Sequence, residues 1–300
     1  MRNTLEPESV VRNYFEISGL ENYRLTVDVD DNLNARTVSA SAEMDIQSTF
    51  MHMFGVRALT SPASGIAEER IGNVEISMVL DISGSMGRNG KLANMQRAAR
   101  DFVTRMMEAN DPVEDDMYVS ISIVPYNGRV NAGSTIESVF TLSNEHNESS
   151  CTRFSADDYN TTAIHPDQPI ERLAHFDYDN RNRYYSDENY YENYIFDPHC
   201  QTNDFGAIMP WSQDESAMHA HINSLSAGGW TAIDLGMNWG VGLLDPAARP
   251  AAQQLAAQGI VHDDFSDRPL NYPGPETPAD EDTMKVVVLM TDRWRKYQSI

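Results

Sequence analysis

The chain has 300 residues, 41% of them hydrophobic and 9% aromatic, which is normal for a protein that buries a core. Its 45 acidic and 22 basic side chains give a formal net charge of -23, so its surface repels nucleic-acid phosphates and anionic lipid headgroups. These properties exclude nucleic acid as an expected partner. No apolar run reaches the roughly 20 residues of a transmembrane helix, so membrane attachment is expected only through a segment absent from this chain.

Residues 1–70 are predicted to form a small α+β unit. Apolar residues recur at helical spacing over 10–15, and the period then changes to two. Residues 23–29 and 38–44 alternate between apolar and polar side chains, which predicts a β-hairpin. A short helix over 48–54 should pack on this hairpin.

Residues 71–300 carry the alternating strand and helix pattern of an α/β domain. The strand-helix-strand order at its start predicts a parallel sheet. A polar excursion at about 131–210 interrupts the pattern and has too few aliphatic residues for a core of its own, so we interpret it as an insertion loop. The predicted elements are a strand at 74–80, a helix at 91–107, a strand at 118–124, helices at 214–225 and 232–244, and a strand at 285–290.

The two cysteines, Cys151 and Cys200, bracket a polar stretch rich in tyrosine. A disulfide would close a loop of about 50 residues, which in the chain-entropy description stabilises the fold by about 4 kcal/mol. Two separate reduced thiols are the alternative. The tyrosines from Tyr178 to Tyr194 are compatible with a partner-binding surface or with a solvated loop.

The strongest functional motif is the sequence VLDISGSMG, which follows the strand at 74–80. It places Asp81, Ser83 and Ser85 in a loop between a strand and a helix, where open sheets bind their ligands. One carboxylate and two hydroxyls are hard oxygen ligands, which suit Mg²⁺, Mn²⁺ or Ca²⁺ better than zinc. The motif therefore predicts a divalent metal site.

With this motif the sequence resembles the von Willebrand factor A domains, whose metal-ion-dependent adhesion site joins D-x-S-x-S to a threonine and an aspartate from later loops. Thr231 in SAGGWTAID and Asp292 in VVVLMTD match those two positions. The resemblance implies a Rossmann-like parallel sheet flanked by helices, and a site for Mg²⁺, with Mn²⁺ or Ca²⁺ as alternatives, formed by Asp81, Ser83, Ser85, Thr231 and Asp292. Singly, these residues are also explained as helix N-caps and turn formers.

A narrower resemblance joins the segments VEISMVLDISGSM, KLANMQRAARDFV and TAIDLGMNWGVGLLDP to TadG-like proteins of Tad (Flp-type) pilus machinery. It implies a place on the periplasmic or extracellular face of a bacterial envelope, with an N-terminal membrane helix outside this chain. Arg293 stands where the family usually has glycine, and the chain ends at Ile300. We therefore expect an incomplete C-terminal part, with the strand Lys285–Met290 as an exposed edge that promotes self-association.

The leading functional hypothesis is a metal-dependent module that binds an acidic group of a pilus or envelope protein. A structural component in which the metal only stabilises the fold is the alternative. A metal-assisted hydrolase that uses Asp81 or Asp292 has less support, because the sequence places no histidine, lysine or cysteine near the motif as a base. We therefore expect no enzymatic activity.

Overall fold

A computed structural model describes the chain as two compact units, Met1–Ile71 and Gly72–Ile300. No helix in the described part is both long and apolar enough to span a membrane. The residues that the structure describes are 6–20, 23–31, 35–47, 58–70, 73–108, 118–176, 198–272, 274 and 283–292.

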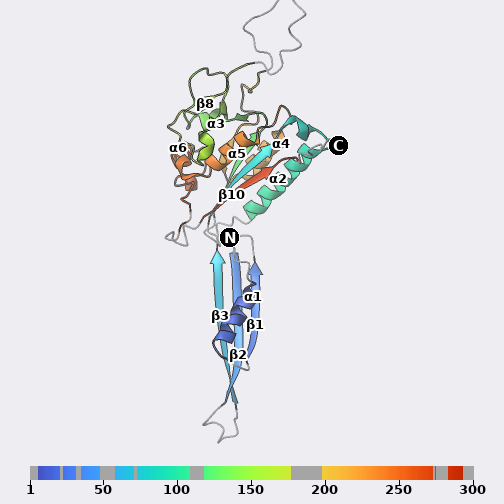
Figure 1. The fold of residues 1–300 in the computed structure, drawn as a ribbon, viewed down its shortest axis with the longest axis vertical. Helices are drawn as coiled ribbons and strands as arrows, with labels where there is room; N and C mark the ends of the chain where they lie inside the picture. Colours follow the sequence, from blue (N-terminus) through green and yellow to red (C-terminus); the bar gives the residue numbers. More distant parts are fainter. Residues whose placement is uncertain are drawn as a thin grey trace, which may run out of the picture. The chain divides into compact units, whose positions relative to one another are not determined.

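In its described part, the first unit is a three-stranded antiparallel sheet with one helix (Figure 1). The helix contacts the first strand through Phe15 and Tyr23, whose ring centroids lie 5.0 Å apart. The predicted helix and hairpin are confirmed, whereas the third strand was missed because its serine, proline and glycine content hides the alternation. The helix expected at 48–54 lies outside the described residues. The elements are α1 Pro7–Ile17, β1 Tyr23–Asp31, β2 Ala35–Gln47 and β3 Ala58–Arg70.

The second unit is built around a four-stranded mixed sheet with the order β10-β4-β5-β9. Strand β4 pairs in parallel with β10 and β5, whereas β9 runs antiparallel to β5. All residues of β4 are buried, as expected for a strand with neighbours on both sides. The strands are β4 Asn73–Asp81, β5 Tyr118–Tyr126, β9 Met209–Ser212 and β10 Thr283–Met290.

The predicted fold class, a Rossmann-like parallel sheet flanked by helices, is wrong. The described strands form three small sheets, two of them antiparallel and one mixed. Apolar runs indicate where strands lie but not in which direction they run. Strand β9 lies at the edge of the sheet and runs antiparallel to β5. The strand-helix-strand order of the sequence does not predict the direction of this added strand.

Helix α5 packs closely on the mixed sheet through its glycines. A Cβ atom at Gly236 would lie 2.7 Å from the ring of Tyr126 and 3.0 Å from Val79, so only glycine lets the helix approach this far. Helix α2 contacts α4, and the Thr104 hydroxyl donates a hydrogen bond of 2.5 Å to Glu215. The helices are α2 Lys91–Glu108, α3 Gly133–Glu137, α4 Glu215–Ser224, α5 Ile233–Gly242 and α6 Arg249–Ala257.

The region interpreted as an insertion loop contributes to the main core in its described part. Ile136, Phe140 and Ile164 are buried in one cluster with Trp239 of α5. The predicted disulfide between Cys151 and Cys200 is confirmed, with an S–S distance of 2.01 Å. The region also forms a small antiparallel sheet with β6 Val130–Asn131, β7 Cys151–Arg153 and β8 Glu171–Arg172. The tyrosines from 178 to 194 lie outside the described residues.

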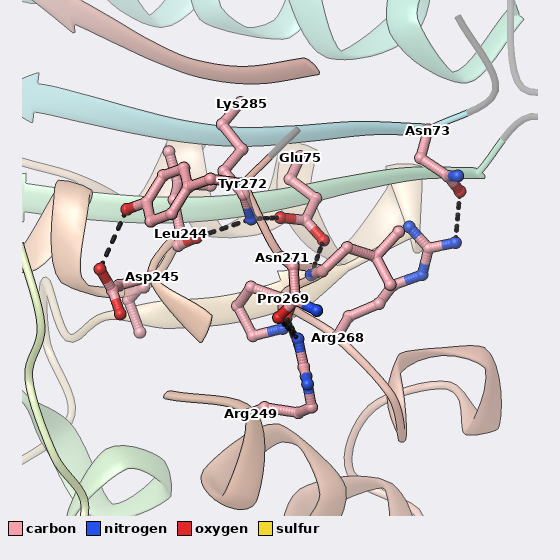
Figure 2. Close-up of polar contacts among 12 residues, drawn as sticks. Asn73, Glu75, Leu244, Asp245, Arg249, Arg268, Pro269, Asn271, Tyr272 and Lys285 are labelled. Carbon is pink, nitrogen blue, oxygen red and sulfur yellow. Dashed lines mark hydrogen bonds and ion pairs between the residues drawn. The ribbon is translucent and has the colours of Figure 1, made fainter. Parts of the chain in front are cut away.

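A buried ionic network joins β10 to β4 and to the segment after α6 (Figure 2). The side chains of Lys285 and Glu75 form an ion pair and are only 9% and 2% exposed. Glu75 also accepts a hydrogen bond of 2.7 Å from the backbone N–H of Leu270, and Lys285 donates one of 2.8 Å to the carbonyl of Leu244. Arg268 extends the network by donating to Asn73. These contacts fix the strand that leads to Asp292.

Candidate metal centre

Asp81 is the buried anchor of the candidate site. It ends β4, where it pairs with Tyr126 of β5, and it is fully buried. A buried carboxylate requires hydrogen-bond donors, and two are present. One oxygen, Oδ1, accepts from the backbone N–H of Ser83 at 2.8 Å, and Oδ2 accepts from the hydroxyl of Thr291 at 2.7 Å.

The two serine hydroxyls of the motif lie next to each other. Ser83 is buried and Ser85 is exposed, and their Oγ atoms are 3.2 Å apart. The Ser85 side chain lies within hydrogen-bonding reach of Asp292. Together with Lys91, it lowers the pKa of the Asp292 carboxyl. Ser83 and Ser85 therefore connect Asp81 to Asp292, through the backbone N–H of Ser83 on the Asp81 side and through the two hydroxyls on the Asp292 side.

Asp292 is paired with a lysine that the sequence analysis did not place near the motif. Nζ of Lys91, the first residue of α2, lies 2.6 Å from Oδ2 of Asp292. The hydrogen bond from Lys91 lowers the pKa of Asp292 below its ordinary value, so Asp292 is ionised at neutral pH. Lys91 therefore lies near the motif, but its ammonium is held in an ion pair and is unsuited to act as a general base.

Thr231 is not brought onto this cluster by any described contact. It is exposed and makes no hydrogen bond to another described residue. The loop before it does reach the motif, because the Gly84 N–H donates to the carbonyl of Gly229 at 3.0 Å and the Gly228 N–H donates to that of Ile82 at 2.8 Å. Thr291 is the threonine that contacts Asp81, and sequence reasoning passed over it although it precedes Asp292.

Tyr126 adds a buried phenol beside the two carboxylates. Burial raises the pKa of Tyr126 to about 12, and the charges of Asp81 and Asp292 act in the same direction. Tyr126 is therefore neutral at physiological pH. Its hydroxyl lies next to the side chains of Thr291 and Asp81.

The oxygen atoms of this cluster are of the chemical type that binds hard divalent cations. Asp81, Ser83, Ser85 and Asp292 offer carboxylate and hydroxyl oxygens from a single connected cluster. Each carboxylate oxygen of Asp81 keeps further acceptor capacity beyond its one hydrogen bond. Among the described residues, no group of three or more histidine, cysteine, aspartate or glutamate side chains is placed to bind a metal. A site here would therefore depend on the serine hydroxyls.

The face around the cluster carries an exposed tryptophan. Trp230 is 74% exposed, and its backbone lies against Gly128, where an added Cβ would be 3.0 Å from the Cβ of Trp230. Asn127 holds this loop by donating to the carbonyl of Gly228 at 2.9 Å and accepting from the Ala232 N–H at 2.6 Å. Exposed aromatic side chains on a fixed loop are typical of protein-binding surfaces.

No protein-family model matches the chain, and no curated protein matches it in sequence. Among solved structures, the pilus adhesin SpaC of Lactobacillus rhamnosus GG in its open conformation aligns with a TM-score of 0.26 and 11% identity, over 73% of this chain and 16% of SpaC. The pilus adhesin RrgA of Streptococcus pneumoniae aligns with a TM-score of 0.26 and 12% identity, over 89% of this chain and 24% of RrgA. The chain thus spans a quarter or less of these adhesins. Likenesses this weak establish neither a shared fold nor a shared function.

Proposed function

We propose that this chain is a metal-dependent protein-interaction module of a Tad/Flp-type pilus assembly or adhesion system. The observation that carries the proposal is the oxygen cluster of Asp81, Ser83, Ser85 and Asp292 at one edge of the mixed sheet. A divalent cation, with Mg²⁺ as the expected ion, would supply a coordination position that an acidic side chain of a partner fills. The chain's own residues hold the ion and shape the binding face.

Two further observations support an exported interaction module. Trp230 gives the face of the cluster a large apolar side chain that contributes little to the core. The disulfide between Cys151 and Cys200 favours an oxidising compartment, such as the periplasm or the cell exterior. The resemblance to TadG-like proteins supplies the pilus context of the proposal.

One observation favours a structural role as the second candidate. The carboxylates of Asp81 and Asp292 each have donors within the chain, so the cluster also ties β10 to the motif loop without an ion. In that case the ion would add stability and no binding surface. A hydrolase has less support, because Lys91 is engaged in an ion pair and Tyr126 is neutral.

The metal site is tested by Asp81→Asn, which keeps the shape of the side chain and removes its charge. We expect Mg²⁺ or Mn²⁺ to raise the melting temperature of the wild type through binding to the folded state, and to leave Asp81→Asn unchanged. Asp263→Asn removes an exposed carboxylate elsewhere and should respond like the wild type. If the wild type shows no shift, or if Asp81→Asn shifts equally, the metal site is wrong.

The interaction role is then separated from the structural role by Ser83→Ala/Ser85→Ala. Two properties of this variant would be measured and compared with those of the wild type. The first is the amount of envelope protein that the immobilised chain captures with and without EDTA, and the second is the free energy of unfolding in urea. A recognition role predicts that capture is lost while the metal-free stability stays within about 1 kcal/mol of the wild type. Unchanged capture together with a lost metal effect on stability would favour the structural role.

A further inference from the structure

Lys91 places a positively charged ammonium group next to the candidate metal centre. Among the described residues, the centre contains two carboxylates, Asp81 and Asp292, and one ammonium, that of Lys91, so these three groups carry a net charge of -1. Tyr126 faces the same carboxylates as a neutral phenol. A divalent cation would change this net charge to +1, whereas without Lys91 the loaded centre would be neutral.

Asp292 is the shared element between Lys91 and any bound cation. It is the one carboxylate that pairs with Lys91 among the described residues, and its side chain is 13% exposed. A cation that takes up the charge of Asp292 therefore weakens the ion pair of Lys91. The Lys91 side chain is 37% exposed, so part of it lies at the surface, where an incoming carboxylate can approach.

We infer that Lys91 couples the binding of the metal to the binding of an acidic partner. This inference rests on the proposed function. While no partner is present, the ion pair with Asp292 and the charge of Lys91 both oppose the cation. Once a cation is bound, the released ammonium attracts the partner's carboxylate. Because coupling between two ligands is reciprocal, the partner's carboxylate strengthens metal binding by the same factor.

The size of the effect follows from the position of Lys91. An opposite charge a few ångström from a carboxylate changes that group's affinity for a cation by about tenfold or more, and partial exposure of Lys91 reduces this by screening. We therefore expect removal of the ammonium to tighten binding of the metal alone by roughly fivefold. Removal of the ammonium should also abolish most of the increase in metal affinity that a bound carboxylate causes.

The experiment compares wild type, Lys91→Met and Lys91→Arg by titration calorimetry with Mg²⁺. Each protein is titrated in sodium chloride and in sodium acetate at equal ionic strength, with acetate as the carboxylate probe. We expect acetate to tighten Mg²⁺ binding to the wild type and to Lys91→Arg, which keeps the charge. Lys91→Met should bind Mg²⁺ more tightly than the wild type in chloride and should respond less to acetate.

The outcomes separate this inference from the metal site itself. If Lys91→Met equals the wild type in both salts while Asp81→Asn binds no Mg²⁺, the coupling role of Lys91 is overturned and the metal site stands. If the wild type binds no Mg²⁺, both are overturned. Melting of the metal-free variants shows whether Lys91→Met is folded, and Lys91→Gln replaces it if it is not.

Discussion

Removal of the buried ammonium of Lys285 should be among the most damaging single substitutions in this chain. Lys285→Met would leave Glu75 as a carboxylate that is 2% exposed and that keeps the backbone N–H of Leu270 as a donor. Breaking a buried ion pair in this way costs up to about 3–5 kcal/mol, because the remaining charge loses its nearest partner. The charge of Arg268 still acts on Glu75 and reduces this loss in part. The carbonyl of Leu244 also loses its donor. A loss of this size is a large part of the roughly 5–15 kcal/mol that stabilises a typical domain.

Urea unfolding followed by tryptophan fluorescence would measure this loss. All four tryptophans lie in the second unit, and Trp211 and Trp239 are buried there, so the signal reports the unit that contains the ion pair. Arg153→Met is the matched control, because it breaks an exposed pair with Glu171 and should change the free energy of unfolding by about 1 kcal/mol or less.

A double variant tests the physical reason for the loss. Glu75→Gln/Lys285→Met removes the stranded charge and keeps an amide oxygen to accept from the Leu270 N–H. It should recover about 2 kcal/mol relative to Lys285→Met alone. The reasoning would be refuted if Lys285→Met unfolded within about 1 kcal/mol of the wild type, or if the double variant were less stable than the single one.

Two further substitutions test the packing of α5 and the covalent link. Gly236→Ala should destabilise the protein, because the added Cβ overpacks against Tyr126. Overpacking costs about 1–3 kcal/mol, which outweighs the gain of up to about 1 kcal/mol from the higher helix propensity of alanine. Gly228→Ala is the control and should be near neutral in the same urea assay, because nothing lies within 4 Å of its added Cβ. Equal stability of the two variants would contradict the close approach of α5. Cys151→Ser/Cys200→Ser should lower the free energy of unfolding by about 4 kcal/mol, as expected for a closed loop of this length, and dithiothreitol should affect only the wild type.

Six of the twelve described α-helices and strands of the second unit were predicted from the sequence, but their arrangement was not. The apolar runs that became β4, β5 and β10 and the periodic stretch of α2 are strong local signals. Strand direction is not a local property, so the antiparallel β9 escaped detection and the fold class was misassigned. Likewise, Ile136 and Phe140 are buried by packing against Trp239, which lies about 100 residues away along the chain and is invisible to composition.

The candidate site shows the same division. Asp81, Ser83 and Ser85 share one short loop, so their proximity followed from spacing, and the cysteine pair was a similar inference from position. The contact between Lys91 and Asp292 joins residues 201 positions apart. Lys91 begins the helix directly after the motif, and this was a signal that could have been used. Thr231 makes no described hydrogen bond to the cluster, so its place among the metal ligands stays a prediction that rests on the motif alone.

The two loops that frame the oxygen cluster are held together by main-chain groups, through the bonds from Gly84 to Gly229 and from Gly228 to Ile82. Hydrogen bonds between backbone groups do not depend on the identity of most side chains in the two loops. Gly84 is an exception, because a Cβ there would lie 3.1 Å from the carbonyl oxygen of Gly229. Exposed neighbours such as Trp230 can therefore be exchanged without displacing the loops. Related chains could acquire new partners by substitution on this face while the frame beneath it stays the same.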